Sequence, residues 1–153
     1  MPARSAGVLL FRCDPLEVLL VHPGGPFWAK KDRGVWSIPK GEYDDTEDPL
    51  TCARREFAEE LGSDVPAGRI VELGEVKQKS GKVVTAYAVE GDVDAKAVHS
   101  NTFEMEWPPR SGRTAEFPEV DRAEWLSLDA AREKVIPAQA AFLARLVDAL
   151  GES

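Results

Sequence analysis

Three glutamates, Glu56, Glu59 and Glu60, have the residue type and the spacing that could bind a metal ion. On a helix, positions i, i+3 and i+4 project from one face, so these carboxylates would be neighbours. Like charges at this spacing destabilise a helix by about 0.2–0.5 kcal/mol per pair. A hard divalent cation such as Mg²⁺ would turn this repulsion into binding, because it takes oxygen ligands and often bridges carboxylates to phosphates. The alternative is an ordinary solvated acidic helix face.

The surrounding segment predicts a helix that follows an acidic loop. Asp48 is a good N-cap, and Pro49 suits the first helical position because its missing N–H has no partner there. Gly62 can take the left-handed conformation that ends a helix. Four apolar residues at helical spacing would form the buried face: Leu50, Ala53, Phe57 and Leu61. The loop that starts at Gly41 is crowded with acids: Glu42, Asp44, Asp45, Glu47 and Asp48.

Charge and composition favour a cation site in one compact chain. The 153 residues carry a net charge of −8, and residues 42–60 alone hold eight acids and two bases, a balance of −6. An acidic chain is a poor candidate for non-specific nucleic-acid binding. The two cysteines, Cys13 and Cys52, indicate neither a disulfide framework nor a zinc site. With no membrane-length apolar run and no signal peptide, we expect one cytoplasmic domain over residues 1–153.

The stretch from Gly41 to Gly62 resembles the Nudix box, Gly-x5-Glu-x7-Arg-Glu-U-x-Glu-Glu-x-Gly-U, where U is a bulky apolar residue. One position departs, because Ser63 stands where the last apolar residue belongs. Such a long pattern at fixed spacing is a specific signal. The resemblance implies an α/β/α sandwich with a mixed sheet, and a hydrolase of phosphoanhydride bonds. The matching residues are Gly41, Glu47, Arg55, Glu56, Phe57, Glu59, Glu60 and Gly62.

The resemblance also implies roles for these residues. Glu56, Glu59 and Glu60 would hold one to three Mg²⁺ or Mn²⁺ ions. Arg55 and Glu47 would pair and steer the helix against the loop at Gly41. Gly41 and Gly62 would likewise support the site rather than react.

Two segments outside the box extend the resemblance. The run from Trp36 to Gly41 looks like the lead-in of Nudix hydrolases that act on dinucleoside polyphosphates and diphosphoinositol polyphosphates. By that likeness, the Lys40 carbonyl is a metal-ligand candidate and its ammonium group a phosphate contact. Glu119 precedes Trp125 by six residues, where relatives have a glutamate that completes the metal site or activates water. Glu119 or a helix glutamate would accept the proton of the attacking water, and Glu116 is the second candidate for Glu119's position.

Apolar runs and turn residues predict the other elements. Residues 5–12 and 17–22 read as paired strands, 35–39 as a short strand, and 69–77 with 82–90 as a hairpin around Ser80-Gly81. Residues 102–107 alternate as a half-buried strand, and a last strand lies within 117–128. Ser127 caps a short helix through Lys134, and Pro137 opens a final helix.

Several loop residues have two readings from sequence. Phe27 and Trp28 could stack on a base, but covering the core is the favoured interpretation. Arg110 and Arg113 are candidates for binding substrate phosphate, or they form an exposed basic loop. The same two readings apply to Lys30, Lys31 and Arg33. The histidines, His22 and His99, have no ligand spacing and are expected to be structural or exposed.

Three functions remain open. The favoured one is hydrolysis of a small-molecule diphosphate, with a nucleotide as the expected substrate class and diphosphoinositol polyphosphates as another. The second is a module that binds a nucleotide without cleaving it. The third is a metal-dependent isomerase of a prenyl diphosphate. The intact box favours the hydrolase, because a binding module needs no set of metal-ligand glutamates. The sequence does not indicate the oligomeric state.

Overall fold

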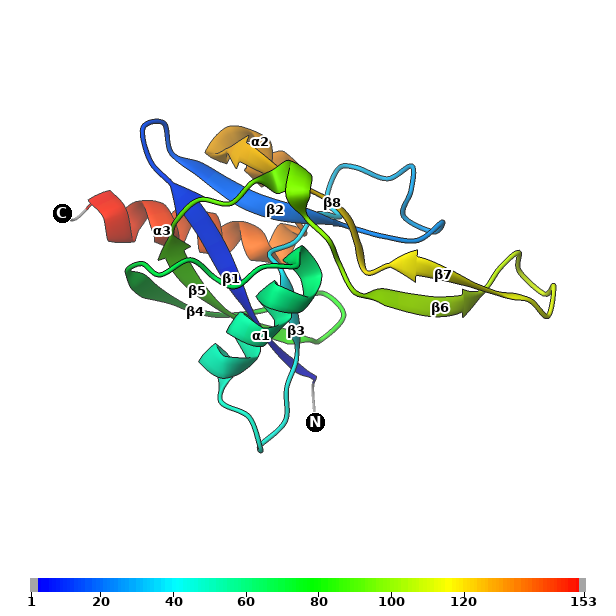
Figure 1. Cartoon of the computed structure of the whole chain (residues 1–153). Coiled ribbons are helices and arrows are strands. Elements are labelled where there is room, and N and C mark those ends of the chain that lie inside the picture. Colours follow the sequence, from blue (N-terminus) through cyan, green and yellow to red (C-terminus); the bar gives the residue numbers. More distant parts are fainter. Residues whose placement is uncertain (1–2, 152–153) are drawn as a thin grey trace.

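The computed structural model describes residues 3–151, which form a mixed sheet between helices (Figure 1). The main sheet has the order β4-β5-β1-β2-β8, and β3 pairs with β1. Its strands are β1 (Arg4–Arg12), β2 (Glu17–Pro23), β3 (Lys40–Glu42), β4 (Ile70–Lys77), β5 (Val83–Glu90) and β8 (Val120–Ser127). The helices are α1 (Pro49–Leu61), α2 (Leu128–Lys134) and α3 (Ala140–Gly151). β1 runs parallel to β5 and antiparallel to β2, so the predicted mixed sheet is confirmed.

Alternation along β1 explains the layers. Ala6, Val8 and Leu10 pack with α1, whereas Leu9 and Phe11 pack with α2 and α3 on the opposite face. Successive strand side chains point to opposite faces, and a strand covered on both sides reads as one apolar run. The α/β/α sandwich expected from the resemblance is therefore confirmed.

The ends of α1 follow the sequence prediction. The Asp48 side chain accepts a hydrogen bond from the Thr51 N–H, and Pro49 is the first helical residue. At the other end, Gly62 has a φ of 78° and donates its N–H to the Ala58 carbonyl. Local capping chemistry thus fixes the length of the helix.

The predicted strand over residues 35–39 is wrong. Trp36 and Ser37 form only isolated bridges, to Val135 and Val21, and the regular strand begins at Lys40. Pro39 has no N–H for a ladder, although its carbonyl accepts from the Val8 N–H at 3.2 Å. Pro137 opens a short 3₁₀ turn, η2 (Pro137–Gln139), before α3, and another, η1 (Ala95–Ala97), lies in the predicted 91–101 loop.

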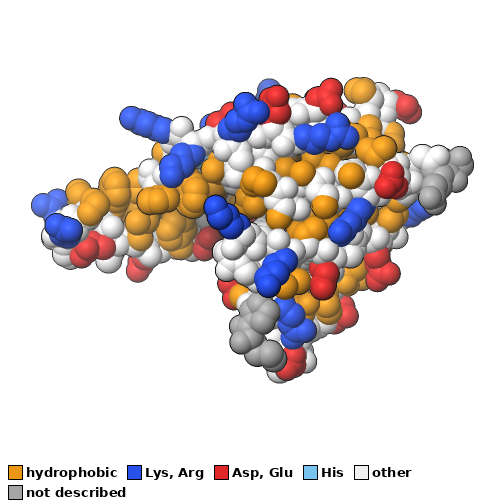
Figure 2. Space-filling view, turned by 180° about the vertical axis from the view of Figure 1, so that it is seen from behind, with side chains coloured by type: hydrophobic (Ala, Val, Ile, Leu, Met, Phe, Trp, Pro, Cys, Tyr) orange, Lys and Arg blue, Asp and Glu red, His pale blue; other side chains and the backbone are white. Residues whose placement is uncertain are grey.

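A separate two-stranded hairpin projects from the body (Figure 1). It consists of β6 (Thr102–Glu106), which the sequence predicts, and β7 (Thr114–Pro118), which it does not. Phe103 and Met105 are half-buried between exposed glutamates, as the alternation predicts. Figure 2 shows hydrophobic side chains along this arm, with Lys and Arg side chains at its tip.

Among residues 3–151, no helix is long and apolar enough to cross a membrane.

Candidate active site

The site is built where β3 meets α1. Lys40 and Gly41 pair with Gly7 and Ala6 of β1, which brings the β3 backbone against the helix. A methyl group added at Gly41 would lie 2.0 Å from the Glu56 carboxyl group. The Cys52 thiol of α1 donates to the Gly41 carbonyl at 3.3 Å. Glycine is therefore required at position 41 for Glu56 to lie against this strand.

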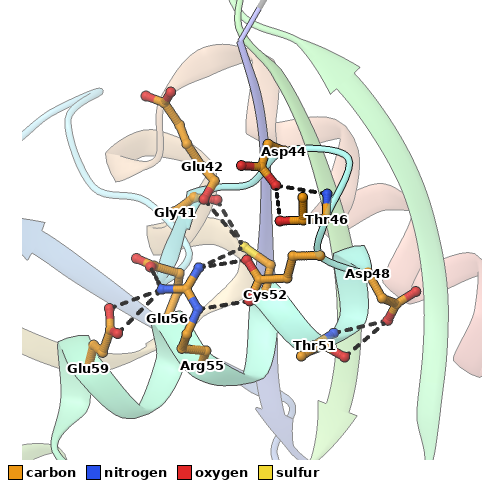
Figure 3. A network of polar contacts seen from close by, with 11 residues as sticks. Gly41, Glu42, Asp44, Thr46, Asp48, Thr51, Cys52, Arg55, Glu56 and Glu59 are labelled. Atoms are coloured by element: carbon orange, nitrogen blue, oxygen red, sulfur yellow. Dashed lines mark hydrogen bonds and ion pairs between the residues drawn. The ribbon is translucent and has the colours of Figure 1, made fainter.

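Arg55 forms ion pairs with two of the helix glutamates, Glu56 and Glu59 (Figure 3). It donates to both carboxylate oxygens of Glu47, each at 2.9 Å, so the predicted pair is present. Its Nη1 also lies 2.6 Å from Glu56 and 3.3 Å from Glu59. Hydrogen bonding to Arg55 lowers the pKa of Glu47, and the same bonds raise the pKa of Arg55.

Backbone hydrogen bonds connect Glu119 to α1 through Asn101. The Asn101 N–H donates to the Glu59 carbonyl at 2.9 Å, and the Asn101 carbonyl accepts from the Glu119 N–H at 2.8 Å. The Glu119 carbonyl in turn accepts from the Gly24 N–H at 3.0 Å. These bonds satisfy a carbonyl near the end of α1 and fix Glu119 across from the helix face.

The acidic residues line a cavity of about 430 Å³. Two lysines, Lys40 of β3 and Lys82, line the same cavity as the carboxylates. Sequence reasoning missed Lys82, since it precedes β5 and reaches the site only through the parallel pairing of β5 with β1. The lining residues are Lys40, Gly41, Glu42, Glu56, Glu59, Glu60, Lys82, Asn101, Thr102 and Glu119.

The carboxylates are held in an environment that disfavours their charge. Burial and the charge of Glu56 raise the pKa of Glu60 to about 8, although Lys40 partly opposes the shift. Burial and Glu59 also raise the pKa of Glu56. For Lys40, burial and the charge of Lys82 lower the pKa. Burial therefore disfavours the ionised forms of Glu56, Glu60 and Lys40 alike.

The donor types suit a hard divalent cation, but the side chains are not yet arranged for one. Glu56, Glu59 and Glu60 offer carboxylate oxygens, which Mg²⁺ and Mn²⁺ prefer. Within the described part of the chain, however, no three His, Cys, Asp or Glu side chains converge to hold a metal ion. The bonds from Arg55 to Glu56 and Glu59 account for part of this separation.

A second cavity, of about 250 Å³, shares Lys40, Glu60 and Glu119 with the first. Trp28 lines it, whereas Phe27 is 63% exposed, so the favoured reading of Phe27 as core cover is wrong. The Phe27 ring instead contacts its own segment, lying edge-on to Trp28 at 5.0 Å between ring centroids and 4.6 Å from the Lys31 ammonium. The remaining lining is mostly aliphatic: Val21, Pro23, Gly34, Val35, Ser37, Ile38, Val120 and Ile136.

Other candidate residues lie apart from both cavities. Arg110 and Arg113 are exposed in the turn between β6 and β7 and line neither cavity. Glu116 is exposed on β7, opposite Glu104, so Glu119 and not Glu116 joins the helix glutamates. Lys30, Lys31 and Arg33 are exposed in the 24–34 segment, and so is His99, which lies beside Gly62. His22 is buried.

Comparisons with known proteins agree with this architecture. A family model described as NUDIX domain matches residues 1–146. A Caenorhabditis elegans Ap4A hydrolase in a binary complex superposes with a TM-score of 0.66 at 18% identity, over 97% of this chain and 99% of that one. The NUDIX domain of Shewanella oneidensis NrtR complexed with ADP ribose gives 0.67 at 20% identity, over 98% and 89%. A mutT/nudix family protein from Listeria innocua gives 0.64 at 15% identity, over 99% and 96%.

Proposed function

The chain belongs to the NUDIX domain family, and from that premise we propose that it is a metal-dependent hydrolase of nucleoside diphosphates linked to a further group. The bond broken is a phosphoanhydride, and the expected substrates include dinucleoside polyphosphates and nucleoside triphosphates. One observation carries the proposal. A cavity with the three helix glutamates and two lysines adjoins an apolar pocket that has an indole in its wall, and Lys40, Glu60 and Glu119 line both.

Glu56, Glu59, Glu60 and the Lys40 carbonyl would hold the cation, which we take to be Mg²⁺ or Mn²⁺. When bound, such a cation neutralises charge on the diphosphate oxygens and lowers the pKa of water. To hold it, Glu56 and Glu59 would exchange their contacts with Arg55 for contacts with the cation. The two hydrogen bonds that Arg55 donates to the Glu47 carboxylate would keep Arg55 in place during this exchange. Arg55 is thus a support for the site and not a phosphate ligand.

Residues on the other walls would act on the substrate directly. The ammonium groups of Lys40 and Lys82 face the carboxylates across the cavity and would bind phosphate oxygens. Glu119 enters from a different segment than the helix and would accept the proton from the attacking water. A glutamate of the helix remains the alternative proton acceptor.

The apolar pocket favours a nucleotide over an inositol polyphosphate. A nucleobase is flat and can stack on Trp28, between aliphatic side chains such as Val35 and Ile136. An inositol ring with several phosphates needs many cationic donors, and of the described residues 3–151 only Lys40 brings a positive charge to this pocket. Arg110 and Arg113 would contact phosphate only in a substrate long enough to extend along the β6–β7 hairpin.

A nucleotide-binding module without catalysis is the second candidate. It is favoured by the arrangement of the helix carboxylates, which are bonded to Arg55 and do not converge as metal ligands among residues 3–151. In that case the cavities would bind a nucleotide, and added Mg²⁺ would produce no cleavage.

A substrate panel separates the two. Wild type would be tested with Ap4A, ADP-ribose, nucleoside triphosphates, nucleotide sugars and a diphosphoinositol polyphosphate, each with Mg²⁺ or Mn²⁺. The hydrolase proposal predicts phosphate, pyrophosphate or AMP release that Glu60→Gln abolishes and that Glu133→Gln, an exposed substitution on α2, leaves intact. Nucleotide binding by calorimetry with no release from any compound would support the module instead.

A further inference from the structure

His22 is buried with a hydrogen-bond acceptor at each ring nitrogen. The side chain has 0% exposure and lies edge-on to Trp36 at 5.1 Å between ring centroids. Nε2 lies 2.6 Å from the Lys31 carbonyl oxygen, and Nδ1 lies 2.9 Å from the Asp121 carboxylate. A carbonyl can only accept, so Nε2 carries a proton. When Asp121 is ionised, Nδ1 must carry a proton as well for both bonds to form.

The Asp121 end of this arrangement depends on a bulge in the sheet. His22 pairs with Arg122, but the next residue, Pro23, pairs with Val120. Asp121 is therefore the extra residue on β8, without a partner on β2. The Asp121 side chain is 31% exposed. Directly before the bulge lie Val120 and Glu119, which both line the apolar pocket.

The hydrogen bond from His22 to Lys31 fixes Trp28, which lines the apolar pocket. The Lys31 N–H donates to the Trp28 carbonyl at 2.9 Å, while its own carbonyl accepts from His22. The Lys31 ammonium lies 5.1 Å from the centre of one Trp28 ring. Lys31 thus holds Trp28 by its main chain and its side chain, and His22 holds Lys31.

We propose that His22, which is hydrogen-bonded at both ring nitrogens, is a positioning residue that ties the Trp28 wall of the apolar pocket to the β8 bulge next to Glu119. The His22 ring sets the distance between the 24–34 segment, where Trp28 would bind the base, and the β8 bulge, next to which Glu119 would accept the proton. The two bonds serve different parts of the reaction. The Nε2 bond supports substrate binding through Trp28, and the Nδ1 bond supports the chemical step through the bulge. This inference rests on the proposed function for its kinetic consequences, but not for the tether itself.

Two substitutions separate the bonds. His22→Gln retains an N–H near the position of Nε2, and His22→Asn retains one near Nδ1. Tryptic cleavage at Lys30, Lys31 and Arg33, measured against cleavage at Lys79 in the β4–β5 turn, reports opening of the 24–34 segment without any ligand. We expect His22→Asn to speed this cleavage on the order of tenfold, as loss of one buried hydrogen bond does for a local opening, and His22→Gln to leave it within about twofold. Equal acceleration by both variants, or by neither, would overturn the tether.

Kinetics with the nucleotide that wild type hydrolyses best tests the division of roles. His22→Asn should raise KM about tenfold with kcat within about threefold, and His22→Gln should lower kcat about tenfold with little change in KM. Identical effects of the two variants on both parameters would contradict the division. If wild type hydrolyses nothing in the panel, the proposed function fails, while the cleavage assay still decides the tether.

A spectroscopic test on wild type needs no variant to fold. The ¹⁵N spectrum of the His22 ring should show a proton on Nε2, which the bond to the Lys31 carbonyl requires. A ring without a proton on Nε2 would overturn the proposal.

Discussion

Gly41 and Glu56 lie so close together that a methyl group on the glycine would approach the Glu56 carboxyl group to 2.0 Å. The contact explains why a glycine in β3 and a glutamate in α1 occur at fixed spacing. It also makes the position of one carboxylate sensitive to a single added carbon. A substitution at Gly41 would therefore move the Glu56 carboxylate without removing it.

Gly41→Ala should impair catalysis more than stability. The added methyl group would push the Glu56 carboxylate off β3, and a displacement of about 1 Å can reduce activity by about 100-fold. We expect kcat/KM for the best nucleotide to fall by at least that factor, with a melting temperature lowered by a few degrees. Gly151→Ala is the control, since nothing lies within 4 Å of its added carbon. Full activity in Gly41→Ala would show that Glu56 need not stay against the strand.

The stability of the metal-free protein should fall as pH rises through the neutral range. Glu60 has a folded-state pKa of about 8 against its ordinary value of 4.5, so between these values the folded state binds up to one more proton than the unfolded state. Unfolding free energy then decreases with rising pH, by up to about 1.4 kcal/mol per unit.

Urea denaturation in EDTA at about pH 5 and about pH 8 measures this slope. Saturating Mg²⁺ should reduce it by stabilising the ionised carboxylates, and Glu60→Gln should remove most of it. A wild-type slope equal to that of Glu60→Gln would contradict the assignment to Glu60.

Glu47→Gln should weaken cation binding although residue 47 is not a proposed ligand. Without its bidentate partner, Arg55 is free to bond more strongly to Glu56 and Glu59, which the cation needs. We expect the Mn²⁺ dissociation constant, measured by electron paramagnetic resonance, to rise several-fold. Asp45→Asn removes the same charge from the same loop, where Asp45 pairs with Arg4 at the surface. A rise of equal size in both variants would indicate only a loss of general acidity.

Trp28→Ala should raise KM for nucleotides by about tenfold, because stacking on an aromatic wall contributes about 1–3 kcal/mol per base. Trp28→Phe should keep much of the affinity, since the flat ring remains. Trp107→Ala serves as the control, as this residue is also partly exposed but lies at the end of the hairpin. Calorimetry with AMP measures the effect separately from turnover. Unchanged AMP affinity in Trp28→Ala would show that the base does not bind in this pocket.

The sequence predicts the features that depend on local chemistry. Asp48, Pro49 and Gly62 fix the ends of α1 through bonds within a few residues, so capping preferences were sufficient to predict the helix. The faces of β1 follow from its uninterrupted apolar run. The Glu47–Arg55 pair lies within the box, and it is the resemblance to the Nudix box that predicts it.

Features that depend on distant pairing were beyond sequence reasoning. Lys82 reaches the cavity because β5 runs parallel to β1, and no local pattern near Lys82 predicts that partner. Glu119 was proposed by resemblance, but the bonds through Asn101 that hold it opposite α1 join segments far apart in the chain. Trp28 lines a pocket because of the His22 and Lys31 contacts, and the bulge at Asp121 leaves no mark in the sequence.

Product release from the substrate panel with Mg²⁺ or Mn²⁺ tests most directly whether the helix glutamates make this site a metal-dependent phosphoanhydride hydrolase. We expect release from a nucleoside-linked diphosphate by wild type and by Glu133→Gln, no release in EDTA, and a loss of at least about 100-fold in Glu60→Gln. Release by Glu60→Gln within a few-fold of wild type would show that hydrolysis does not depend on the helix glutamates.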